Sequence, residues 1–153
     1  MRVLVTGASG LLGLNLAFEL AGSPARHEVT GVVNAHALRV QPGGALPFAV
    51  LQADLLAPGA LERLLDQVQP EWVIHCAALA NLEACEADPE LARRLNAELP
   101  GRLAGLVCQR GARLLHVSTD AVFDGGRGGY TEQDAPAPLG VYAQTKLDAE
   151  SAV

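Results

Sequence analysis

Three glycines follow the first apolar run of the chain at a spacing of three residues. The run Val3-Leu4-Val5 passes directly into Thr6-Gly7-Ala8-Ser9-Gly10-Leu11-Leu12-Gly13, after which leucine and alanine recur at helical spacing. A buried strand that turns sharply into a helix needs glycines at the bend and where helix and strand meet. The free N–H groups and the dipole at such a helix N-terminus favour an anionic ligand. The segment therefore predicts a strand–turn–helix unit that holds a phosphate group.

Each glycine has its own expected role in this unit. Gly7 permits the tight turn, Gly10 lets the backbone approach a pyrophosphate, and Gly13 allows close packing of helix on strand. The spacing is G-x-x-G-x-x-G, whereas the commonest dinucleotide fingerprint is G-x-G-x-x-G. A tight structural turn without a ligand also explains three glycines, but the position after an N-terminal buried strand favours a nucleotide.

Short β-branched runs alternate with longer leucine- and alanine-rich runs along the rest of the chain. Crossovers of this length imply right-handed βαβ units and a doubly wound parallel α/β sheet, with strand order 3-2-1-4-5 and ligands at the carboxyl edge. The 153 residues suit one domain, and we expect a loop over Ala35–Leu46. The expected strands are Arg2–Thr6, Glu28–Val33, Phe48–Gln52, Trp72–Cys76 and Arg113–Ser118, and the expected helices are Leu11–Ala21, Pro58–Val68, Pro89–Gln109 and Tyr142–Ala152.

Charge and composition exclude several classes of protein. The net charge of −6 argues against nucleic acid or an anionic membrane surface as a partner. No apolar run reaches the roughly 18 residues that span a bilayer. Three irregularly spaced cysteines fit a reducing compartment better than a disulfide framework, so we expect a cytoplasmic protein.

The residues after the second and third strands bear on the choice of cofactor. An NAD site usually has an acidic residue about 20 residues past the glycines, but here the strand ends in neutral Asn34. Arg39 nearby could meet a 2′-phosphate, which favours NADP, although a solvated loop charge is an equal interpretation. Asp54 is placed to accept a hydrogen bond from an adenine amino group, and capping of the next helix is the alternative.

The fourth strand runs into small residues. Ala77 and Ala78 would let a flat nucleotide or sugar lie against the backbone. His75 and Cys76 could be interpreted as metal ligands, but no C-x-x-C or H-x-x-x-H pairing accompanies them. We therefore expect no metal site, and we expect His75 and His116 to be histidines at the edge of the core.

A tyrosine and a lysine lie four residues apart in the last expected helix. Tyr142 and Lys146 share one face of that helix, so the ammonium can lie beside the phenol and favour its phenolate form. A hydroxyl from Ser118 or Thr119, where strand five ends, could bind the same carbonyl oxygen that Tyr142 would protonate. Y-x-x-x-K alone is common on helices, and only the upstream glycine segment makes a catalytic role attractive.

Taken in order, these motifs resemble the extended short-chain dehydrogenase/reductases, whose nucleotide-binding part has the Rossmann-type fold. The segment S-T-D-A-V-F-D-G from Ser118, followed by Y-T-E from Tyr130 and Y-A-Q-T-K from Tyr142, is similar to the dTDP-4-dehydrorhamnose reductase branch. The resemblance implies that residues 1–153 form an NAD(P)-binding domain. It also implies reduction of a dTDP-4-keto-sugar with hydride from the nicotinamide, and it allows a homodimer.

The resemblance assigns roles by position. Tyr142 would donate the proton, Thr119 would hold the carbonyl oxygen, and Lys146 would bind the nicotinamide ribose. Asn96 matches a position that steadies the site through hydrogen bonds. The residues implied to contact the cofactor are Gly7, Gly10, Leu11, Leu12, Gly13, Asn34, Arg39, Asp54, Leu55, Ala77, Ala78, Ser118, Tyr142 and Lys146.

The sequence departs from this family in two respects. Asparagine is usual in the family where Gly140 stands, and glycine where Ala143 stands. Family members are also about twice as long, so we expect the sequence to stop before the last strands and the substrate region. Two alternatives stay open: a nucleotide-sugar epimerase or dehydratase of the same superfamily, and a non-catalytic NADP-binding subunit like the regulatory subunit of methionine adenosyltransferase.

Overall fold

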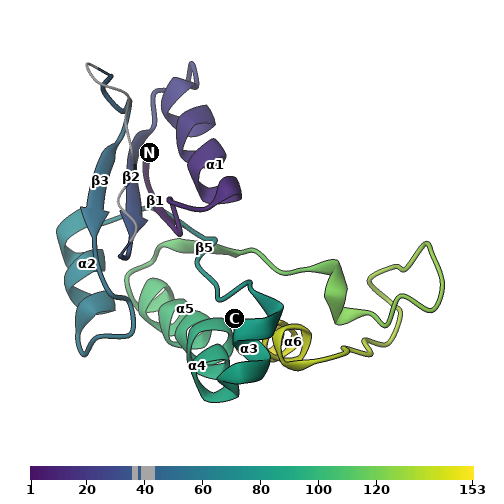
Figure 1. The fold of residues 1–153 in the computed structure, drawn as a ribbon. Coiled ribbons are helices and arrows are strands. Elements are labelled where there is room, and N and C mark those ends of the chain that lie inside the picture. The colour runs from purple at the N-terminus through teal and green to yellow at the C-terminus, as the bar shows by residue number, and fades with distance from the viewer. Residues whose placement is uncertain (36–37, 39–43) are drawn as a thin grey trace.

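A five-stranded parallel sheet organises the chain (Figure 1). The computed structural model describes residues 1–35, 38 and 44–153. The strand order is β3-β2-β1-β4-β5, which confirms the predicted doubly wound order 3-2-1-4-5. The strands are β1 (Arg2–Thr6), β2 (Glu28–Val33), β3 (Ala49–Gln52), β4 (Trp72–His75) and β5 (Arg113–His116).

Helices connect and cover these strands. In Figure 1, α1 lies beside β1 and β2, and α2 and α5 lie on the other side of the sheet. The short helices α3 and α4 and the last helix, α6, gather next to α5. Their bounds are α1 (Leu11–Gly22), α2 (Ala60–Val68), α3 (Leu82–Ala87), α4 (Pro89–Arg93), the π-helix η1 (Arg94–Glu98), α5 (Leu99–Gln109), the 3₁₀ helix η2 (Asp120–Val122) and α6 (Val141–Ala152).

The core has two layers because the strands are apolar on both faces, as expected for a parallel sheet. On one face Val3, Val5 and Val29 pack with residues of α1 such as Ala17. On the other face, strand residues pack against α2 and α5 in a cluster of buried side chains: Leu4, Val32, Val73, Leu61, Leu65, Leu103 and Val107.

Two expected helices differ from their predicted course. The helix expected from Pro58 begins at Ala60, because Gly59 adopts a left-handed φ of +70° just before it. The helix expected over Pro89–Gln109 contains the π-helical turn η1. Pro100 accounts for this turn, since proline lacks an N–H and its ring crowds the carbonyl of residue i−4.

The predicted ends of that long helical run are confirmed. The Asp88 carboxylate accepts a hydrogen bond from the Leu91 N–H at 3.0 Å and so caps α4. Gly111 stops α5 with a φ of +67°. The helix α3, which the sequence did not predict, begins at Leu82 with Asn81 as its cap.

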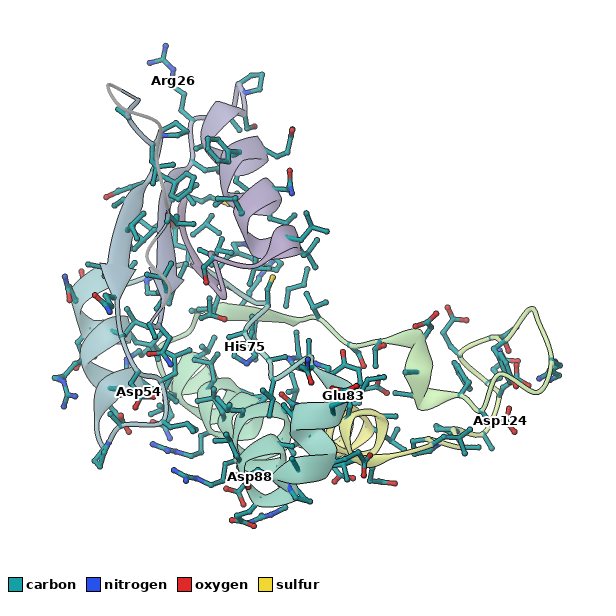
Figure 2. The ribbon with its side chains drawn as sticks, in the orientation of Figure 1. Arg26, Asp54, His75, Glu83, Asp88 and Asp124 are labelled. Carbon is teal, nitrogen blue, oxygen red and sulfur yellow. The ribbon has the colours of Figure 1, made fainter. Side chains whose placement is uncertain are left out.

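An arm of chain leaves the body between η2 and α6. Figure 2 shows Asp124 on this arm, away from the sheet. The arm closes at its base where the Ala137 N–H donates to the Val122 carbonyl at 2.9 Å. The rings of Phe123 and Tyr130 stack with centroids 4.5 Å apart. None of the described helices combines the length and apolar character needed to cross a membrane.

Candidate active site

The glycine segment makes the turn that the sequence predicts. Gly7 has a φ of +69°, and a Cβ there would lie 2.7 Å from the Ala77 nitrogen. A Cβ at Gly13 would lie 2.4 Å from the Gly7 carbonyl oxygen. Both positions therefore exclude any side chain, which lets α1 begin directly above the end of β1.

The N-terminus of α1 is open to a ligand. Gly10 is its N-cap residue, and no side chain in the described part of the chain caps it. The first turn contains no acidic residue, and Leu11 is 86% exposed. Uncapped N–H groups with the positive end of the helix dipole suit an anion such as a pyrophosphate.

A cavity of about 260 Å³ lies at the carboxyl edge of the sheet, between the glycine segment and the ends of β2, β3 and β4. It is the place where the strand order reverses and where doubly wound sheets bind ligands. The cavity brings together seven predicted cofactor residues: Gly7, Gly10, Asn34, Asp54, Leu55, Ala77 and Ala78. Leu11, Leu12 and Gly13 are outside its lining, and Arg39 falls outside the described residues.

Asp54 does not cap the following helix, so that alternative is wrong. Its carboxylate accepts from the Leu56 N–H at 3.0 Å, while Gly59 precedes α2 without a side-chain cap. The side chain is exposed beside the cavity, and Figure 2 shows it where β3 leads toward α2. In the described part of the chain, its only hydrogen bond is the one that Oδ1 accepts from Leu56.

Helix α6 carries Tyr142 and Lys146 one turn apart. Lys146 is only 3% exposed, and its Nζ donates to the Val117 carbonyl at 2.6 Å. The same Nζ lies 3.1 Å from Nε2 of His116. Burial lowers the pKa of Lys146 below the ordinary lysine value, and the nearby Glu150 opposes that shift.

The hydroxyls at the end of β5 have partners of their own. The Ser118 hydroxyl donates to the carboxylate of Glu150 on α6. The Thr119 Oγ1 accepts from the Ala121 N–H at 3.2 Å and caps η2. The 260 Å³ cavity is not lined by Ser118, Thr119, Tyr142 or Lys146, so the structure does not bring these predicted residues into one cavity with the glycine segment.

Asn96 links the loop after β4 to helix α6. Its Oδ1 accepts from the Leu79 N–H at 2.8 Å, and its Nδ2 donates to the Leu79 carbonyl at 3.0 Å. The same Nδ2 donates to the Thr145 hydroxyl at 3.2 Å, next to Lys146. Asn96 lies in the π-helical turn, where the wider turn is often associated with function. The structure thus shows Asn96 in hydrogen bonds to both segments, and its steadying role in a site stays a prediction.

Two contacts around α6 were not predicted. Glu86 on α3 accepts from the Val141 N–H at 2.7 Å, so a side chain from another helix caps α6. Glu150 accepts from Ser118 one turn after Lys146. The spacing of Lys146 and Glu150 shows that they share a helix face, but no local signal indicates what Glu86 contacts.

Comparison with known proteins places this geometry in a family. The family described as "RmlD substrate binding domain" matches residues 1–153, the whole chain. The chain belongs to this family.

The relatives of this RmlD family member include proteins with two different names. The chain is 40% identical to "Methionine adenosyltransferase 2 subunit beta" of Rattus norvegicus over 152 residues, which cover 99% of this chain and 42% of that protein. It is 36% identical to "dTDP-4-dehydrorhamnose reductase" of Burkholderia thailandensis, covering 100% of this chain and 45% of that protein. The chain thus spans less than half the length of these relatives.

Solved structures share the fold of this RmlD family member. A hypothetical dTDP-4-dehydrorhamnose reductase from Sulfolobus tokodaii superposes with a TM-score of 0.85 at 34% identity, covering 99% of this chain and 51% of that one. The dTDP-4-dehydrorhamnose reductase of Bacillus anthracis in complex with NADP gives 0.78 at 28% identity, covering 98% and 48%. MoeE5 in complex with UDP-glucose and NAD gives 0.80 at 31% identity, covering 99% and 48%.

Proposed function

We propose that the full-length protein catalyses the NAD(P)H-dependent reduction of a dTDP-4-keto-sugar. The observation that carries this proposal is the cavity at the carboxyl edge, where the glycine segment meets Asn34, Asp54, Ala77 and Ala78. Relatives named dTDP-4-dehydrorhamnose reductase support the choice of reaction.

The cofactor in this proposal is NADP, with NAD as the alternative. Gly7, Gly10 and the start of α1 at Leu11 and Leu12 would hold the pyrophosphate, since the uncapped N–H groups of α1 suit that anion. Asp54 and Leu55 would hold the adenine. Neutral Asn34 where β2 ends leaves no carboxylate to repel a 2′-phosphate. The NADP complex of the Bacillus anthracis reductase supports this preference.

The catalytic chemistry is assigned to Ser118 and Thr119, which follow β5, and to Tyr142 and Lys146 on α6. A bound nicotinamide supplies the hydride for the carbonyl carbon. Tyr142 gives its phenolic proton to the carbonyl oxygen, and solvent later returns a proton to the phenolate. Thr119 donates a hydrogen bond to the same oxygen, and the ammonium of Lys146 stabilises the phenolate. Ser118 lines the nicotinamide pocket beside Thr119.

The test is Tyr142→Phe in the full-length protein, which removes the proton donor but keeps the ring. We expect kcat for keto-sugar reduction to fall by about 10²- to 10⁴-fold, while the variant stays folded and still binds the cofactor. Tyr130→Phe is the matched control, because Tyr130 is the second of the two tyrosines and lies on the arm. Wild-type turnover in Tyr142→Phe would show that the role of Tyr142 is wrong.

A second candidate function is that of a non-catalytic subunit of another enzyme. The 40% identity to methionine adenosyltransferase 2 subunit beta favours it. Under this alternative, the full-length protein binds NADP tightly, turns over no keto-sugar nucleotide and co-purifies with another enzyme.

An epimerase or dehydratase, the third option, would turn over nucleotide-sugar without net cofactor consumption. A homodimer is a further prediction, which sedimentation of the full-length protein tests.

A further inference from the structure

Three polar side chains form a row across neighbouring strands on the face covered by α5. The strand register pairs Thr6 of β1 with His75 of β4, and His75 with His116 of β5. Thr6 is fully buried and His75 is 1% exposed. Figure 2 shows His75 at the edge of the sheet, on the side of the helices. His75 Nδ1 and His116 Nε2 have partners within hydrogen-bond distance, whereas the buried His75 Nε2 and His116 Nδ1 have none among the described residues.

The partners determine which ring nitrogens carry a proton. The Thr6 hydroxyl oxygen accepts from the Ala77 N–H at 3.3 Å, and so its hydrogen is available to His75 Nδ1 at 2.7 Å. His116 Nε2 lies 3.1 Å from the Nζ of Lys146. An ammonium can only donate, which makes His116 Nε2 the acceptor and leaves the proton of the neutral ring on Nδ1.

The surroundings of His116 keep its ring neutral. Burial, together with the positive charge of Lys146, lowers the pKa of His116 to about 4. The two histidine rings stack with centroids 5.5 Å apart. Helix α5 packs on β5 through apolar side chains of the core. The other titratable groups near His116 and Lys146 are His75 at the end of β4, Cys76 directly after it, and Glu150 on α6.

We propose that His116 is a positioning residue for Lys146. Its Nε2 and the Val117 carbonyl take two hydrogens of the ammonium and leave the third for a ligand hydroxyl. This inference rests on the proposed function, in which Lys146 binds the ribose of the cofactor. Removing the acceptor at position 116 disfavours the charged form of the lysine, so the lysine loses its proton at a lower pH.

The experiment measures cofactor affinity against pH in the full-length protein. In His116→Leu, we expect the alkaline fall in NADPH affinity to move down by about 1 to 2 pH units, the size expected for one hydrogen bond to a charged group. His116→Gln, which restores an acceptor near the position of Nε2, should return the wild-type profile. Leu114→Met is the packing control, since it changes the same face of β5 without touching Lys146. A folded His116→Leu variant with the wild-type profile overturns the proposal.

A second measurement does not depend on any variant. Nitrogen NMR of the wild-type full-length protein at neutral pH should show His116 as the neutral Nδ1–H tautomer. An Nε2–H tautomer or a charged ring overturns the proposal even where His116→Leu does not fold. If the wild-type protein binds neither NADPH nor NADH, the proposed function fails. The NMR measurement of the His116 tautomer then still tests whether His116 Nε2 accepts a hydrogen bond from Lys146.

Discussion

At the scale of single residues, the start of α6 depends on the backbone at Gly140. This residue has φ +88° and ψ 168°, a conformation that is essentially restricted to glycine. A Cβ there would lie 2.9 Å from Oε1 of Glu86, the oxygen that caps the Val141 N–H. An asparagine, which the resemblance makes usual at this position, would be strained in this conformation, so the way α6 begins here depends on glycine.

We expect Gly140→Asn to lower the free energy of unfolding by about 1 to 3 kcal/mol, the usual cost of a side chain in such a region. Urea unfolding of the purified chain measures the change. Gly128→Asn is the matched control, because a Cβ at that glycine would meet no atom within 4 Å and its φ is not left-handed. Equal stability of the two variants would contradict the strain assigned to Gly140.

At the scale of elements, the π-helical turn η1 places Asn96 toward the loop after β4. The sequence predicted an uninterrupted helix over Pro89–Gln109, although Pro100 inside it was the available signal. Asn96 lies inside this wider turn and is buried. Asn96 thereby joins Leu79 and Thr145, and holds α6 against the end of the sheet.

Asn96→Ala should destabilise the chain, since each buried group left without a partner costs about 1 to 3 kcal/mol. We expect faster hydrogen exchange at the Leu79 amide, which loses its acceptor. Asp88→Ala, which removes an exposed cap of the adjacent α4, should cost about 1 kcal/mol and leave the Leu79 amide protected. Unchanged exchange at Leu79 in Asn96→Ala would show that this link is not needed.

At the scale of the whole molecule, the two faces of the sheet are covered unequally. On one face Leu103 of α5 is completely buried against the sheet in the cluster that also contains residues of α2. On the face of α1, Ile74 is only partly buried, and its register partner Leu115 is 45% exposed. The described part of the chain therefore leaves an apolar surface at Ile74 and Leu115 incompletely covered.

Because the two faces are covered unequally, we expect leucine-to-alanine substitutions on them to lower the free energy of unfolding by different amounts. Leu103→Ala should lower the free energy of unfolding by about 2 to 5 kcal/mol, through lost burial and a cavity. Leu115→Ala should change it by less than about 0.5 kcal/mol, as for most exposed positions. Chemical unfolding of the 153-residue chain measures both. Similar losses for the two variants would mean that Leu115 is buried in solution, for instance by self-association.

Local signals were sufficient for the strand–turn–helix unit and for the order of the strands. Gly13 could be assigned from sequence because it meets Gly7 and Ala8 a few residues away, and Gly7 because the tight turn that needs its left-handed φ is local. The parallel order then follows from alternating apolar runs and right-handed crossovers. The grouping of Asn34 and Asp54 with the glycine segment also follows, since the carboxyl ends of parallel strands meet at one edge.

The sequence by itself therefore determined the type of fold, the edge that holds the cavity and the glycines that shape it. Only the tertiary structure decided the contacts that join distant segments, such as Thr6 with His75 and His116 with Lys146. The physical reason is that strand register and the rotation of α6 are set by packing over the whole core, where no single segment carries the information. The same holds for Glu86, whose carboxylate reaches α6 only because α3 packs beside it.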